Sequence, residues 1–353
     1  MQSHGGQVRR NADFRQGCDD LVESATPARF TRRSLLRAAV FSPHESTYHG
    51  LWDPRQAAAR TAIIGQIVDV SPHIIVLHTD KGERRLALSP TTTAWRGSPV
   101  RPAALRKDDL AIVRSHGTRN EAERIWAQIG RVTGTIIETN GSTLLVDEGP
   151  AKGRKIVLID KSWHSQIQVR FPRLEPGYLI DVIGLRHQGY LQATTPATSQ
   201  PPYRADHPPA PPLISGHIPV PINGTAVWHE PGEEPPGLLG VAYPALDPET
   251  DCESRPAAME PHVVDPHAAG PGCVRLPYLS VGSAVRIHNE CTDRSAVLPV
   301  TSCGAAARLF CDRCVECGTS PKGRIADLTL TAFVELGGKL EVGCFNATLT
   351  IAG

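Results

Sequence analysis

The sequence lacks a surplus of charge of either sign, and it lacks a long apolar run. Lysine and arginine number 37 against 36 aspartates and glutamates, so the formal net charge of the 353-residue chain is +1. Such a chain has no general attraction to nucleic acid or to an anionic membrane surface. No stretch approaches the roughly 20 apolar residues that a transmembrane helix requires. We therefore expect neither a nucleic-acid partner nor a transmembrane segment.

Motifs of several familiar enzyme classes are also missing. The chain has no glycine-rich phosphate-binding loop, no Gly-x-Ser-x-Gly elbow and no His-Glu-x-x-His pair. The sequence therefore predicts no cofactor and no bound metal.

Cysteine is almost absent from the first 250 residues, where Cys18 stands alone. An even number of cysteines in a small domain predicts a disulfide framework, which forms in an oxidising compartment. Too many pairings are open for spacing alone to assign any. The eight cysteines of the C-terminal region are Cys252, Cys273, Cys291, Cys303, Cys311, Cys314, Cys317 and Cys344.

The first 58 residues show no sustained apolar period, and we expect them to form a flexible leader. Arg32 and Arg33 resemble the pair of a twin-arginine export signal. The apolar stretch that should follow is short and is interrupted by Arg37, so the signal is incomplete. Together with the cysteines, this pattern favours an extracellular or cell-envelope location.

An internal repeat follows the leader. Gly65 is matched by Gly134, 69 residues later, and Trp95 is matched by a second tryptophan, Trp163. Each copy contains about five short strands separated by turn residues, and the Asn140-Gly141 pair predicts a type I′ hairpin turn in the second copy. Five strands must curl into a small barrel to bury one face and protect their edges. The sequence predicts two tandem barrels of the oligonucleotide/oligosaccharide-binding (OB) type, at residues 59–130 and 131–195.

Proline dominates residues 196–236, which predicts an extended, semi-rigid linker between modules. Residues 237–353 then resume short alternating strands, at 283–287, 295–300 and 344–351. The apolar spacing over Ile325–Leu336 predicts a short helix that ends at a Gly-Gly pair. The overall expectation is an all-β chain of three barrels, the last one rich in cysteine.

Three segments of this last domain resemble the rare lipoprotein A/expansin family of double-psi β-barrels. The segments read LGVAYPA at Leu239–Ala245, RLPYLSVGSAVRIHN at Arg275–Asn289 and GRIADLTLTAFVELG at Gly323–Gly337. The resemblance covers about a third of the chain. It implies a barrel that contacts cell-wall polysaccharide such as peptidoglycan, with Tyr243, Asn289 and Arg324 among its binding residues.

Some members of that family cleave glycan strands as lytic transglycosylases, which need a carboxyl group as acid and base. The resemblance makes Asp327 the leading candidate, with Glu260 and Asp265 as weaker ones. Two polar positions of the family are replaced here, by Cys273 and Ser302. This departure favours a barrel that binds glycan without efficient catalysis.

Other interpretations remain open at this point. Asp327 can serve as the N-cap of the expected helix. The Cys-x-x-Cys-x-x-Cys run at Cys311–Cys317 can bind a metal, although disulfides are favoured, and the His262–His267 segment offers a weaker metal set. The chain as a whole can also be a structural or assembly subunit whose barrels bind protein partners.

Overall fold

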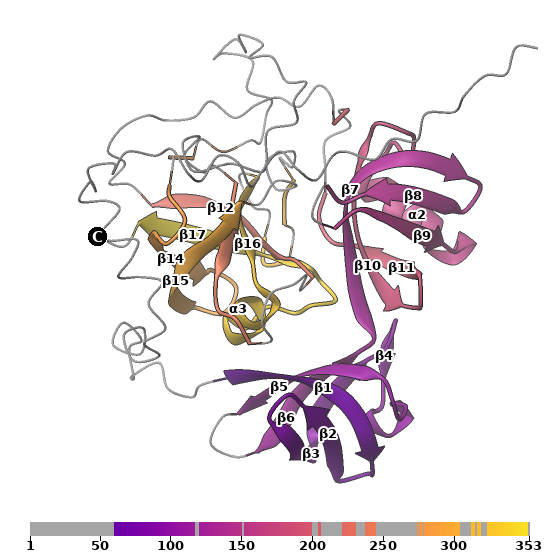
Figure 1. The fold of residues 1–353 in the computed structure, drawn as a ribbon, viewed down its shortest axis with the longest axis vertical. Coiled ribbons are helices and arrows are strands. Elements are labelled where there is room, and N and C mark those ends of the chain that lie inside the picture. Colours follow the sequence, from indigo (N-terminus) through magenta and orange to yellow (C-terminus); the bar gives the residue numbers. More distant parts are fainter. Residues whose placement is uncertain are drawn as a thin grey trace, which may run out of the picture. The chain divides into compact units, whose positions relative to one another are not determined.

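The computed structural model describes residues 60–116, 120–149, 152–199, 204–205, 221–230, 237–244, 274, 276–277, 279–303, 312–314, 316–318 and 323–351. These residues are mostly in β-strands, which form three closed sheets in chain order (Figure 1). Within this described part, no helix is long and apolar enough to cross a membrane.

The first sheet contains six strands and a 3-10 turn. They are β1 (Arg60–Val70), β2 (Ile74–Thr79), β3 (Gly82–Trp95), β4 (Pro99–Val100), η3 (Pro102–Ala104), β5 (Leu110–His116) and β6 (Glu121–Ala127). Their order is β2-β1-β5-β6-β3-β4, and β2 also pairs with β3. That last pairing closes five of the strands into a ring. Only the β3–β6 pair is parallel.

The second sheet repeats this arrangement. It contains β7 (Ile129–Asn140), β8 (Thr143–Asp147), β9 (Arg154–Ile159), β10 (Leu179–Arg186) and β11 (Tyr190–Pro196), with α2 (Lys161–Arg170) between β9 and β10. The strands close in the order β10-β11-β9-β8-β7, and only β9–β11 is parallel. The second barrel therefore repeats the strand pairing of the first, but the matched tryptophans differ, because Trp95 ends β3 and Trp163 lies in α2.

The matched glycines of the repeat have a common physical reason. A Cβ atom added at Gly65 would meet the carbonyl oxygen of His78 on the neighbouring strand. A Cβ atom at Gly134 would collide with the carbonyl oxygen of Asp147 in the same way. Each repeat thus needs a residue without a side chain where its first two strands approach most closely.

The Asn140-Gly141 pair marks a hairpin, but the turn lies one residue further along than expected. β7 ends at Asn140, which pairs directly with Thr143 of β8. The central residues are therefore Gly141 and Ser142, and Gly141 has a φ of 59°. Glycine at the first central position is typical of a type II′ turn rather than the type I′ turn with Asn140 at its centre.

The third sheet is a closed barrel of six strands and one helix. Its elements are β12 (Ile222–Trp228), β13 (Val241–Tyr243), β14 (Ala284–Asn289), β15 (Arg294–Cys303), β16 (Arg324–Leu328), α3 (Leu330–Glu335) and β17 (Cys344–Ile351). The order is β12-β16-β13-β15-β14-β17. Two pairs, β12–β16 and β13–β15, are parallel, and the other pairs are antiparallel.

Two expectations for this region differ from the structure. The strand β12 lies in the stretch interpreted as linker, because its apolar residues follow directly on the proline-rich segment. The predicted helix at Ile325–Leu336 begins only at Leu330, since residues 324–328 form the buried strand β16. A strand buried on both faces is continuously apolar, and periodicity alone does not separate it from a buried helix.

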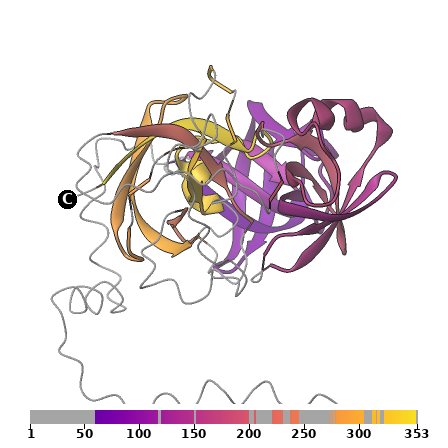
Figure 2. The same cartoon turned by 90° about the horizontal axis from the view of Figure 1, so that it is seen from above.

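Separate apolar clusters fill the interiors of the first and second barrels. A third cluster fills the last barrel and extends into both repeats, through residues such as Trp95, Trp126 and Ile183. The helix α3 lies where the last barrel meets strand β1 of the first barrel (Figure 2). The last barrel therefore packs against the repeats and is not held away from them by a spacer.

Candidate functional site

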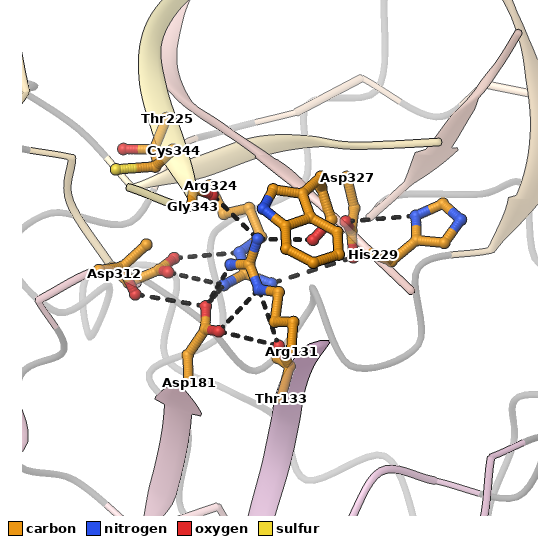
Figure 3. A network of polar contacts seen from close by, with 12 residues as sticks. Arg131, Thr133, Asp181, Thr225, His229, Asp312, Arg324, Asp327, Gly343 and Cys344 are labelled. Carbon is orange, nitrogen blue, oxygen red and sulfur yellow. Dashed lines mark hydrogen bonds and ion pairs between the residues drawn. The ribbon is translucent and has the colours of Figure 1, made fainter. Parts of the chain in front are cut away.

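The segment Gly323–Gly337 contributes two residues near its start to a buried cluster of charges. Strand β16 contributes Arg324 and Asp327, and Asp312 lies beside them. Two strands of the second repeat, β7 and β10, contribute Arg131 and Asp181. These side chains point toward one another from both barrels (Figure 3).

Asp181 joins the two arginines. Its Oδ1 and Oδ2 atoms accept hydrogen bonds from Nε and Nη2 of Arg131, at 2.8 and 2.5 Å. Oδ2 also accepts one from Nη2 of Arg324, at 2.7 Å. Burial opposes ionisation of Asp181, but the two guanidinium charges outweigh it, so its pKa lies below its ordinary value. Asp181 is therefore an ionised bridge between two barrels.

Arg131 is held on its other side by the third barrel. Its Nη1 atom donates to the carbonyl oxygens of Trp228 and Gly343, at 2.5 and 2.9 Å. Its guanidinium carbon also lies 5.6 Å from the centre of the Trp228 ring. A planar guanidinium can satisfy carboxylate and carbonyl acceptors together, which lysine cannot do in this geometry.

Arg324 completes the cluster. Its Nε and Nη2 atoms donate to the two carboxylate oxygens of Asp312, at 3.2 and 2.7 Å. Burial would lower the pKa of Arg324, but Asp312, Asp181 and Asp327 together raise it above its ordinary value. Arg324 is thus permanently charged and only 3% exposed. The resemblance implied that Arg324 contacts a polysaccharide. Its side chain lies in the interior instead, away from any ligand on the surface.

Asp327 is paired with His229, the residue that follows β12. Its Oδ1 atom lies 3.3 Å from Nδ1 of His229, and its Oδ2 atom lies 4.0 Å from Nη1 of Arg324. Burial raises the pKa of Asp327. The charges of His229 and Arg324, with the hydrogen bond from His229, lower it by more than burial raises it. The net pKa is well below the ordinary range, so this carboxyl group is ionised at neutral pH.

The expected helix N-cap is a different residue. Thr329 caps α3, and its hydroxyl oxygen accepts a hydrogen bond from the N–H of Ala332. Asp327 lies inside β16, where it pairs with Ala242 of β13. The interpretation of Asp327 as a helix cap is therefore wrong, because the strand continues past it.

The remaining binding candidates are also interior residues. Tyr243 is fully buried, and its hydroxyl donates to the carbonyl oxygen of Pro277 at 2.9 Å. Asn289 is fully buried as well; its Nδ2 donates to Leu336 and its Oδ1 accepts from the N–H of Cys291. Both side chains tie strands of the barrel to its loops, so neither reaches a ligand on the surface.

Several sequence candidates lie outside the described residues. They are the two weaker acid candidates, Glu260 and Asp265, and three of the cysteines, Cys252, Cys273 and Cys311. Cys303 ends β15, but its side chain is also outside the described part.

Among the described residues, four C-terminal cysteines form two disulfides. Cys291 is bonded to Cys317, and Cys314 is bonded to Cys344. Two sulfurs of the Cys-x-x-Cys-x-x-Cys run are thus engaged and do not serve as metal-binding thiolates. In the described part of the chain, no group of three or more His, Cys, Asp or Glu side chains is placed to hold a metal.

Sequence reasoning missed four of the six residues of the charge cluster. Arg131, Asp181, Asp312 and His229 belong to no motif and lie far apart in the chain. The repeat did carry a signal, because the 69-residue spacing aligns Ala62 with Arg131 and Ile112 with Asp181. An apolar pair in one copy that is replaced by a charged pair in the other indicates a contact particular to the second copy.

Known proteins add no further identification. No family model matches the chain, and a search of curated proteins finds no match.

Proposed function

We propose that the protein is a cell-envelope or secreted protein whose third barrel binds peptidoglycan or a related wall polysaccharide without efficient catalysis. The two disulfides support an oxidising compartment. The resemblance of three segments to the rare lipoprotein A/expansin family supports the ligand class. In this proposal the third barrel is of the double-psi type and the two repeats are of the OB type.

The strand pairings support those architectures. If the short strand β4 is left out, the first strand of each repeat pairs with the second and the fourth, and the third strand runs parallel to the fifth. This order suits a five-stranded Greek-key barrel of the OB type. The two parallel pairs of the third barrel require crossover connections, which suit a double-psi arrangement.

The proposal that the third barrel lacks efficient catalysis is supported by the environment of Asp327. A transglycosylase acid must hold a proton near neutral pH before it can protonate the leaving oxygen. Asp327 is ionised there, because His229 and Arg324 stabilise its negative charge. Its side chain is also only 10% exposed. The same pairing suits a barrel that has kept the family framework and uses this carboxylate for stability.

Sedimentation with insoluble peptidoglycan tests the proposal. The purified full-length protein is mixed with sacculi, pelleted and measured in both fractions, and the soluble products are analysed by mass spectrometry. We expect the protein in the pellet and no anhydro-muropeptides in solution. Protein left wholly in the supernatant, with a defined oligomer in light scattering, would refute wall binding and favour an assembly subunit.

Catalysis is tested separately. Release of anhydro-muropeptides that disappears in a folded Asp327→Asn variant would overturn the non-catalytic reading. Circular dichroism of the variant establishes that it is folded. Equal, background-level release by the wild type and the variant supports the proposal.

A further inference from the structure

An open pocket lies at strand ends of the two repeats, apart from the charge cluster. It is lined by Arg96, Gln128, Arg186, His187 and Gln188, with a cavity volume of about 410 Å³. Arg96 follows β3, Gln128 connects β6 to β7, and the other three residues come from the end of β10 and its turn into β11. A volume of this size is typical of small-molecule sites.

Both arginines of the pocket are held in place from behind. Asp109, which is buried, accepts hydrogen bonds from Nε and Nη2 of Arg96, at 2.8 and 3.3 Å. Glu230 accepts one from Nη2 of Arg186, at 3.1 Å. Neither carboxylate is among the lining residues. The lining therefore presents guanidinium groups whose orientation is fixed in advance, which reduces the entropy lost when a ligand binds.

Arg186 retains donor capacity. A guanidinium group carries five N–H donors, and Glu230 occupies one of them. Its Nε atom is buried without a hydrogen-bond partner among the described residues. The side chain as a whole is 29% exposed, so its other N–H donors are available to a ligand in the pocket.

Two other lining residues, His187 and Gln128, are also held in place. The imidazole of His187 stacks on Tyr190, with ring centres 4.6 Å apart and 12° between the planes. Gln128 has a φ of 51°, which is uncommon for a residue other than glycine. Its carbonyl oxygen accepts a hydrogen bond from the N–H of Arg186. Backbone strain of this kind persists where the surroundings fix it, often at binding sites.

We infer that this pocket binds one acidic sugar unit of the wall polysaccharide. A carboxylate on the sugar accepts hydrogen bonds from the arginines, and its hydroxyl groups bind the amides of Gln128 and Gln188. Because each arginine is already paired with a carboxylate, the pocket has little net charge for attracting a bare anion. Recognition therefore depends on the sugar and its carboxylate together. This inference rests on the proposed wall-binding function and adds, in the repeats, a second contact to the one proposed for the third barrel.

Two soluble sugars that differ in one acidic group test the inference. N-acetylmuramic acid carries a lactyl carboxylate that N-acetylglucosamine lacks. Each is titrated into the full-length protein and followed by two-dimensional NMR or calorimetry, with inorganic phosphate as a third probe. We expect N-acetylmuramic acid to bind at least about tenfold more tightly than the other two, since a charged hydrogen bond is worth this much. Equal affinities, or tighter phosphate binding, would overturn the inference.

Variants place the binding in the pocket. Arg186→Gln and Gln188→Ala should each weaken N-acetylmuramic acid binding, the first by about tenfold. Arg173→Gln is the matched control, because Arg173 lies in the same barrel, is 58% exposed and does not line the pocket. Gln188 is exposed, so its variant tests the pocket even if Arg186→Gln fails to fold. Unchanged affinity in Gln188→Ala and in any folded Arg186→Gln protein would refute the assignment.

The outcome is separable from that of the sedimentation test. If the wild type binds the wall but has no affinity for N-acetylmuramic acid, the assignment of the pocket is refuted and the proposed function is kept. If it binds the soluble sugar but does not sediment with sacculi, the proposed function is refuted and the pocket is kept as an acidic-sugar site.

Discussion

Replacing Asp181 by asparagine should destabilise the protein strongly. Asp181 is fully buried and lies between two arginines that are 2% and 3% exposed. The change keeps the shape but removes the negative charge, so Arg131 loses the carboxylate of Asp181, while Arg324 keeps Asp312 and the more distant Asp327. Removing one partner of a buried ion pair costs about 3–5 kcal/mol, because a charge is left uncompensated.

Urea titration followed by tryptophan fluorescence measures this loss. Trp228 packs on Arg131, so its emission reports on the cluster. With a denaturant slope of about 3 kcal/mol per molar urea, the midpoint should fall by at least about 1 M. Asp80→Asn is the matched control, since Asp80 is exposed in the turn between β2 and β3. A loss below about 1 kcal/mol for Asp181→Asn, or one no larger than that of the control, would refute the reasoning.

Three further changes test other parts of the fold. Burial raises the pKa of Glu335 to about 7, so stability should fall as pH rises from about 4.5 through 7; Glu335→Gln should reduce the difference between unfolding midpoints at pH 5 and pH 8. Gly134→Ala should lower the melting temperature, because the new Cβ collides with the backbone of Asp147. Replacing both Cys314 and Cys344 by alanine should cost about 3–4 kcal/mol in denaturant unfolding, since the bond closes a loop of 30 residues.

The repeat was predictable because its landmarks have local causes. Gly65 and Gly134 are required by the close approach of paired strands, and the Asn140-Gly141 pair marks a hairpin. Such requirements act within a few residues or across one strand pair, so they leave a trace in the sequence. The position of β12 left a weaker trace, because a strand that follows prolines looks like the end of a linker.

The candidate site was less predictable. The resemblance led to Arg324 and Asp327, but it did not give the residues that surround them. Their partners Asp181 and His229 are brought close by the packing of barrels and strands that are distant in sequence. Whether a carboxylate is an acid or a structural anion depends on such partners. Residue type and motif therefore identified the position of Asp327 but not its protonation state.

The two repeats use the same face in two ways. In the first repeat, Ala62, Ile64 and Ile112 pack on the apolar cluster of the third barrel. The matched positions of the second repeat hold Arg131, Thr133 and Asp181, which form the buried charge cluster instead.

An apolar contact tolerates many orientations, whereas a bidentate ion pair with fixed carbonyl acceptors tolerates few. The apolar face of the first repeat then stabilises the contact by burying apolar surface. The charged face of the second repeat fixes the orientation of the third barrel relative to it. The third barrel covers this face of each repeat. The strand ends and hairpins of the repeats are therefore the parts left for a ligand, and the pocket at Arg186 lies among them.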